Sequence, residues 1–145
     1  MIERETWAQA LWSRLAGVEG MVYTARNPKA QPTFDRIPFA QFFELEDNVE
    51  ATSSRGGWPV FKRRSRIVVE IFIAGTTEGS ATQELGTFVR KVKRAIFNGG
   101  VNLGGACAEI REIAQSQVLR PQDGKPTIGI GLVYDVLYIE DTSKS

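Results

Sequence analysis

The sequence predicts an α+β fold: a mainly antiparallel four-stranded sheet made of two hairpins, with two helices packed on one face. One of the two hairpins is expected to be long and to protrude. Two segments carry apolar residues at helical spacing, and each is followed by strand-like segments around a glycine-containing turn. The order helix, hairpin, helix, hairpin predicts a single domain over residues 1–145.

The first predicted helix covers residues 5–16. Its apolar residues recur at the spacing of one helical face, and two glycines then follow as ending signals. The face consists of Trp7, Ala8, Leu11, Trp12 and Leu15, and the glycines are Gly17 and Gly20. We expect the tryptophans to anchor the core or an interface, where large aromatic side chains contribute most.

The long hairpin follows a short strand candidate at residues 21–26 and a loop with three prolines at residues 27–38. Residues 39–51 are predicted to be extended, residues 52–59 to turn, and residues 60–75 to return as a long strand. In that strand Ile67, Val69, Ile71 and Ile73 share one face, which is expected to be buried.

A second amphipathic helix is predicted within residues 76–100. Leu85, Phe88, Val89, Val92 and Ile96 form its apolar stripe, and Gly99 ends it. Four cations lie on its solvent side, where they suit the negative end of the helix dipole: Arg90, Lys91, Lys93 and Arg94. The second hairpin, within residues 106–141, is centred on the turn sequence PQDGKP at 121–126.

The composition excludes several classes of function. A net charge of +1 lacks the basic excess of a dedicated nucleic-acid binder. The absence of histidine removes the common triads and His-based metal sites, and one cysteine cannot form an internal disulfide or a thiolate zinc site. We therefore expect no enzyme, cofactor or metal site, no membrane span, and a reducing, cytosolic environment.

The long hairpin carries opposite charges on its two sides. Acidic residues lie on the first strand and basic residues on the second: Glu44, Glu46, Asp47 and Glu50 against Lys62, Arg63, Arg64 and Arg66. If the turn centres near Arg55, residue 44 faces 66 and residue 46 faces 64, so opposite charges meet across the strands. Such pairs fix the register and keep a protruding hairpin soluble.

Two other functions use the same charges. Glu44, Glu46 and Asp47 could hold magnesium or act as general acid and base, which requires that they converge in a pocket. Arg63, Arg64 and Arg66 could bind nucleic acid with a steep salt dependence. The acids facing them and the small net charge count against this second function.

The glycine-rich stretches do not match a nucleotide-binding motif. Residues 129–131 (GIG) and 98–105 (NGGVNLGG) lack the dinucleotide fingerprint and the Gly-Lys-Ser/Thr end of a P-loop. Gly129 and Gly131 lie within a strand, where glycine marks a bulge or a close approach. Cys107 is expected to behave as a small buried hydrophobe.

The sheet has more apolar surface than two helices can cover. Both alternating sets of residues 128–139 are largely apolar, and Val68 and Phe72 extend the second face. A large exposed apolar surface marks an interface, so we predict an obligate oligomer. The predicted contact residues are Glu44, Glu46, Asp47, Glu50, Trp58, Arg63, Arg64, Arg66, Val68 and Phe72.

The order of elements resembles the tail terminator, or tail completion, proteins of long-tailed double-stranded DNA bacteriophages. The resemblance covers nearly the whole chain. It is carried by the helix WAQALWSRLAGV, the strand RIVVEIFIAG, the helix QELGTFVRKVKRAIF and the closing GLVYDVLYIED. The family has no invariant catalytic signature, so the similarity lies in the order of the elements and in their residue patterns.

This resemblance implies a virion subunit at the junction of tail and neck, assembled in the host cytoplasm. A hexameric ring of such subunits caps the tail-tube protein, stops polymerisation and offers a surface to the head-side neck or connector protein. DNA passes through the lumen without specific binding. Another neck or head-tail joining protein is the alternative, and a carboxylate-dependent enzyme is a further one.

Overall fold

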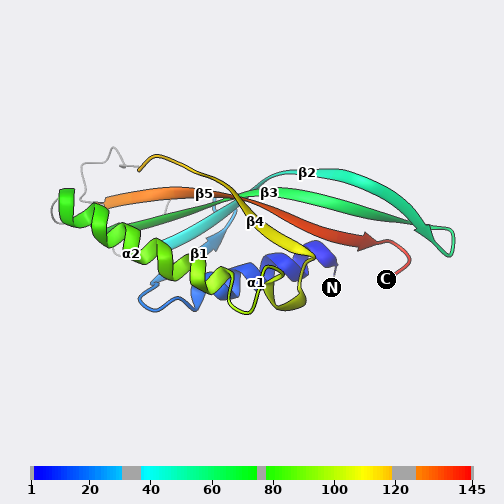
Figure 1. Cartoon of the computed structure of the whole chain (residues 1–145), viewed down its shortest axis with the longest axis horizontal. Coiled ribbons are helices and arrows are strands. Elements are labelled where there is room, and N and C mark those ends of the chain that lie inside the picture. Colours follow the sequence, from blue (N-terminus) through cyan, green and yellow to red (C-terminus); the bar gives the residue numbers. More distant parts are fainter. Residues whose placement is uncertain (1, 31–36, 75–77, 119–126, 145) are drawn as a thin grey trace.

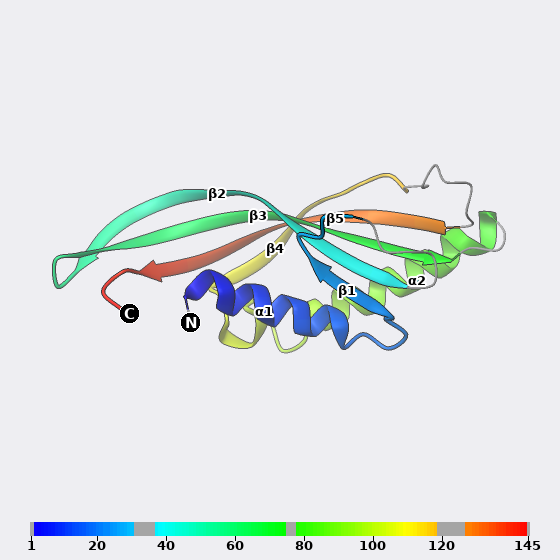
Figure 2. The ribbon, with the colours of Figure 1, turned by 180° about the vertical axis from the view of Figure 1, so that it is seen from behind.

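The computed structural model describes residues 2–30, 37–74, 78–118 and 127–144. Two helices lie on one face of a long, twisted sheet, as Figures 1 and 2 show from opposite sides. Helix α1 spans Glu3–Ala16 and helix α2 spans Glu78–Ile96, with a short 3-10 helix at Leu103–Gly105. The predicted α+β class and the placement of both helices on one face are confirmed.

The sheet has five strands in the order β1-β2-β3-β5-β4 rather than the expected four. The additional strand is β1 (Tyr23–Arg26), which pairs in parallel with the start of β2 (Phe39–Arg55). Strands β3 (Trp58–Ala74), β4 (Glu109–Gln115) and β5 (Thr127–Asp141) complete it with antiparallel pairings. The sequence predicts a strand at residues 21–26, but it does not show that this strand pairs with β2, because that pairing depends on the path of the chain between them.

The long hairpin consists of β2 and β3, each 17 residues long. Arg55 faces Trp58, so only Gly56 and Gly57 form the turn. Both glycines have positive φ, 58° and 84°. Two-residue hairpin turns of this kind need left-handed backbone at both positions, which glycine adopts without a steric cost.

The core lies between the helices and one face of the sheet. Trp7, Leu11 and Leu15 of α1 are fully buried. From α2, Leu85, Val89, Val92 and Ile96 reach the same layer, where they meet Ile67, Val69 and Ile71 of β3. Alternate residues of β5 extend this layer along the last strand, namely Ile128, Ile130, Leu132, Tyr134, Val136 and Tyr138. The predicted apolar faces are confirmed, except that Trp12 is 44% exposed.

The helix-free face is less open than its sequence indicates. Phe72 is only 3% exposed, because its ring stacks on Phe39 at 5.0 Å between centroids and covers Gly129. A Cβ atom at Gly129 would lie 2.3 Å from Phe72, so this glycine allows the close approach predicted for it. The expectation that Phe72 lies open on the second face is therefore wrong, and Val68 is half-buried.

The second hairpin is confirmed by the antiparallel pairing of β4 with β5. Its predicted turn at 121–126 lies outside the described residues. Within the described part of the chain, neither helix has the length and apolar character that crossing a membrane requires.

Candidate functional site: the protruding arm

The most distinctive surface is the distal part of the long hairpin, where β2 and β3 run past the N-terminal end of α1 (Figure 1). We call residues 45–66 together with 135–141 of β5 the arm. Four large apolar side chains are exposed here: Leu45 (57%), Val49 (48%), Trp58 (58%) and Ile139 (46%). Exposed apolar side chains gathered on a projection are typical of a contact surface.

The register of the arm differs from the predicted one. Glu44 faces Ile67 rather than Arg66, Glu46 faces Arg66, and Arg64 faces Asn48. The turn is centred on Gly56 and Gly57 instead of Arg55, which alone would move the partner of Glu44 by three residues, and the interruptions at Leu45 and Glu50 offset two of these. Each interruption is a bulge that adds one residue to β2.

On the helix-free face, the arm carries a row of ion pairs between three strands. Arg66 of β3 donates two hydrogen bonds, of 2.9 and 3.2 Å, to the buried carboxylate of Asp135 in β5. Arg64 lies 3.8 Å from the same carboxylate and pairs with Glu50 of β2 at 2.7 Å. Glu46 lies 4.0 Å from Arg66, and its side chain stays 56% exposed.

A second set of ion pairs lies on the opposite face, because successive side chains of a strand point to opposite sides. Arg63 pairs with Glu140 at 2.9 Å and with Asp47 at 3.2 Å. The Tyr138 hydroxyl donates to Asp47 at 2.6 Å. Near the tip, but on the same face as Asp135, Arg55 pairs with Asp141 at 2.7 Å. Opposite charges do meet within the arm, but β5 supplies several of the acids.

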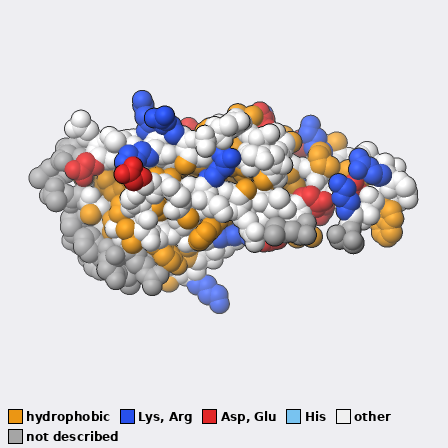
Figure 3. All heavy atoms as spheres, turned by 90° about the horizontal axis from the view of Figure 1, so that it is seen from below, with side chains coloured by type: hydrophobic (Ala, Val, Ile, Leu, Met, Phe, Trp, Pro, Cys, Tyr) orange, Lys and Arg blue, Asp and Glu red, His pale blue; other side chains and the backbone are white. Residues whose placement is uncertain are grey.

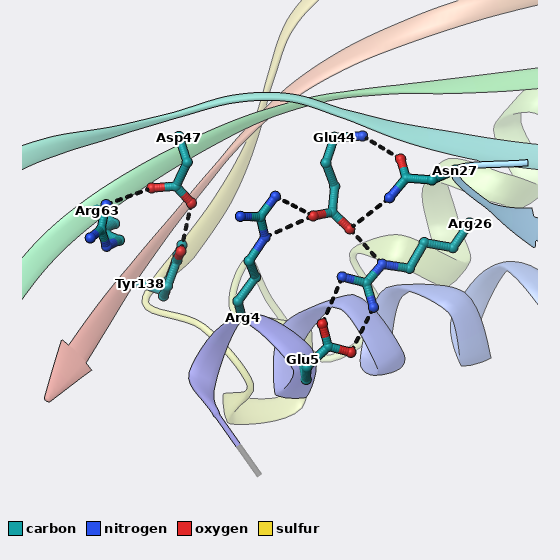
Figure 4. A network of polar contacts seen from close by, with 8 residues as sticks. All are labelled: Arg4, Glu5, Arg26, Asn27, Glu44, Asp47, Arg63 and Tyr138. Atoms are coloured by element: carbon teal, nitrogen blue, oxygen red, sulfur yellow. Dashed lines mark hydrogen bonds and ion pairs between the residues drawn. The ribbon is translucent and has the colours of Figure 1, made fainter. Parts of the chain in front are cut away.

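Glu44 lies at the base of the arm and has different partners. Its side chain is 4% exposed and accepts hydrogen bonds from Arg4 of α1 and Arg26 of β1 (Figure 4). Arg26 also donates to both oxygens of Glu5, at 2.7 and 2.9 Å. Asn27 accepts from the backbone amide of Glu44 at 3.0 Å. This cluster joins α1, β1 and β2 where the arm leaves the helical layer.

The charges of the cluster are well compensated. Burial opposes ionisation of Glu44, but the hydrogen bonds from Arg26 and Arg4 outweigh it and lower the pKa of this carboxyl. The hydrogen bonds from Arg26 likewise lower the pKa of Glu5. Both acids are therefore held ionised by their arginine partners.

The three candidate carboxylates do not converge. Glu44 points to the arginines at the base of the arm, and Asp47 points to Arg63 and Tyr138 (Figure 4). Glu46 lies on the opposite face beside Arg66. A surface hollow of about 340 Å³ lies elsewhere, lined by residues that include Leu85, Val89 and Ile130. No group of three or more metal-binding side chains occurs among the described residues.

The arginines of the arm are engaged in ion pairs rather than free. Hydrogen bonds to Glu140 raise the pKa of Arg63, and those to Asp135 raise the pKa of Arg66. Cys107 is half-buried, and burial raises its pKa to about 11, so little thiolate forms at neutral pH. These groups show no arrangement for phosphate binding or nucleophilic chemistry.

Sequence reasoning missed the partners that come from outside the hairpin. Asp135 is 1% exposed and stands within the largely apolar stretch of β5 at residues 128–139, which is a signal that it needs a cation nearby. Arg4 and Arg26 carry no comparable signal, because charged residues in a first helical turn or a short strand are common at surfaces. Their role follows only from the fold.

Comparisons with known proteins find a likeness in structure alone. No protein-family model matches the chain, and no curated protein matches it. A solved structure titled "Virion of native gene transfer agent (GTA) particle" contains a similar chain, with a TM-score of 0.51 and 13% sequence identity. The match covers 91% of this chain and 92% of that one. The two chains share a fold.

Proposed function

We propose that this protein is a structural virion component that caps the tail tube of a phage-like particle. The observation that carries the proposal is the fold shared, over nine-tenths of both chains, with a chain of a gene transfer agent virion. The resemblance of the sequence to tail terminator proteins specifies the role: a hexameric ring that stops tube growth and presents a docking surface to the neck protein.

The arm supports an assembly role. It places Trp58 at the tip of a long hairpin with 58% of its surface exposed. Trp is enriched among the residues that contribute most to binding at protein interfaces. The ion pairs along the arm link its three strands, and a projection formed before docking lowers the ordering cost.

We also propose that the protein is not an enzyme. The carboxylates that could supply acid and base chemistry lie on opposite faces of the hairpin and are bound to different arginines. General acid-base catalysis needs its groups within hydrogen-bond reach of one substrate.

A tail-length assay tests the capping role. Tail-tube protein of the same particle is polymerised with and without this protein, and tube lengths are measured by electron microscopy. We expect short, capped tubes with wild-type protein and longer tubes with Trp58→Ala, whose fold is preserved because the side chain is exposed.

Val22→Ala is the matched control, since Val22 is 57% exposed but lies between α1 and β1. Tubes of unchanged length in the presence of wild-type protein would contradict capping. Binding to the head-side connector in place of the tube would instead favour a head-tail joining role.

A further inference from the structure

The outer face of α2 carries three cations without a partner in the described part of the chain. Arg90, Lys91 and Arg94 are exposed, and none of them forms an ion pair there, whereas Lys93 pairs with Glu112 at 3.1 Å. The dipole of the helix accommodates cations in its last turn, which contains Arg94. Arg90 and Lys91 lie before that turn, so the dipole accounts for them less well.

Apolar surface lies beside these cations. Phe88 and Phe97 are only partly buried, and each lines a shallow hollow on α2. Lys91 borders the first hollow, and Arg90 and Arg94 border the second. Figure 3 shows the helix-covered side, where Lys and Arg side chains, with Asp and Glu side chains beside them, stand out over the half of the molecule that carries α2; the acid Glu84 lines the first hollow. The surface combines positive charge with accessible aromatic rings.

The outer edge of the arm, formed by β2, carries acidic and apolar side chains that complement this surface of α2. Pairing of β2 with β1 ends at Phe42, so from residue 45 onward β2 pairs only with β3 among the described strands. Along this edge, the acid Glu46 directly follows the exposed Leu45, while the exposed Val49 points to the opposite face of the strand. Because Asp135 already satisfies Arg66 at 2.9 Å, the more distant Glu46 remains available to another cation.

We propose that the arm of one subunit docks, through the outer edge of β2, on the outer face of α2 in a second copy of this chain. Within one subunit, the arm forms one end of the long sheet and α2 lies under the other half (Figure 1), so the two surfaces meet only between copies. A contact between two different surfaces is head-to-tail and either closes into a ring or grows into a filament. The inference rests on the ring assigned above and names its subunit contact.

Charge reversal on each surface tests this contact. Lys91→Glu alters α2, Glu46→Lys alters the arm, and Lys29→Glu is a control with the same charge change on an exposed loop residue. Masses are measured by sedimentation at high protein concentration, alone and with tube protein. We expect each of the first two variants to weaken association at least about tenfold, and the control to match wild type.

Mixing the two interface variants gives the sharpest outcome. The Lys91→Glu subunit keeps Glu46 and the Glu46→Lys subunit keeps Lys91, and the two altered residues also carry opposite charges, so both kinds of contact between the two variants are attractive. An equimolar mixture should therefore assemble beyond the mass of either variant alone, and the double variant in one chain should recover much of the assembly. A mixture no larger than either variant alone, or wild type that stays monomeric alone and on tubes, would overturn the proposal.

The same proteins separate this inference from the capping function. If both variants lose the ring, and tubes grow to unregulated length even with wild-type protein, the subunit contact is supported and the capping function is rejected. If the Lys91→Glu variant still caps tubes normally, the capping function is supported and the subunit contact is rejected.

Discussion

At the scale of single residues, Glu44 has the charge of a surface residue in the sequence but lies buried in the structure, where it holds other residues together. Its side chain is 4% exposed and joins Arg4 of one element to Arg26 of another. Removing one member of a buried ionic cluster leaves the others without compensation. Glu44 is therefore expected to stabilise the fold, in contrast to the exposed Glu46.

Replacement of Glu44 by Gln should lower the free energy of unfolding by about 2 kcal/mol at neutral pH, the usual value of hydrogen bonds to a charged group. The pKa of Glu44 is lower in the folded state than its usual value of 4.5. The carboxylate thus contributes stability above about pH 4.5, and this contribution is lost as the pH falls toward the folded-state pKa.

Urea unfolding from pH 7 to pH 3 provides the measurement. The gap between wild type and Glu44→Gln should be constant near neutral pH and shrink below about pH 4.5, where protonation removes the same charge from wild type. Glu46→Gln is the control and should change stability little, because its side chain is 56% exposed. A gap that does not depend on pH would contradict the role of the charge.

At the scale of elements, the two helices are joined at their ends by one side chain. Arg14 of α1 donates to three carbonyls at the C-terminal end of α2, those of Ala95 (3.1 Å), Ile96 (3.1 Å) and Asn98 (2.7 Å). The last carbonyls of a helix have no partner within it, and a cation there also interacts favourably with the helix dipole. Arg14 thus fixes the end of α2 against α1.

Arg14→Met keeps the apolar stem and removes the donors, so it should destabilise the protein by about 1–2 kcal/mol. Amide exchange should accelerate most in the residues around 95–100, where α2 ends. Arg94→Met removes a cation from the same last turn without breaking a bond to these carbonyls, so its effect should be smaller. Equal effects of the two variants would assign the stabilisation to charge alone.

At the scale of the whole molecule, the elongated shape separates a cationic helix from an arm whose outer edge has no partner among the described strands (Figures 1 and 3). Assembly then depends on contacts between copies, and charge contributes to each contact. Exposed charges are screened over about 10 Å at an ionic strength of about 0.1 M and over about 3 Å at about 1 M.

Subunit association should accordingly weaken as salt is added, while the fold stays intact because its core is apolar. Sedimentation across this range of salt, with circular dichroism as the control for folding, measures both. Association that strengthens with salt would indicate that apolar contacts such as those of Trp58 and Leu45 dominate the interface.

The amino-acid sequence by itself determined the α+β class, the order of the main elements and the faces that become buried. Those properties follow from local periodicity: Leu11 and Leu15, or Ile67 and Val69, share a face because of the geometry of a helix or a strand. The glycines of the predicted turn region at residues 52–59 likewise mark the reversal of the chain, since left-handed backbone is a local requirement. The centre of the turn lies at Gly56 and Gly57 rather than near Arg55.

Only the tertiary structure decided which groups meet. The bulges at Leu45 and Glu50 shift the register of the arm, so Glu46 faces Arg66 and Glu44 turns to Arg4 and Arg26. Asp135 and Phe72 acquire partners from strands far away in sequence. Register depends on the sum of many pairings across the sheet, and a single inserted residue changes every contact beyond it.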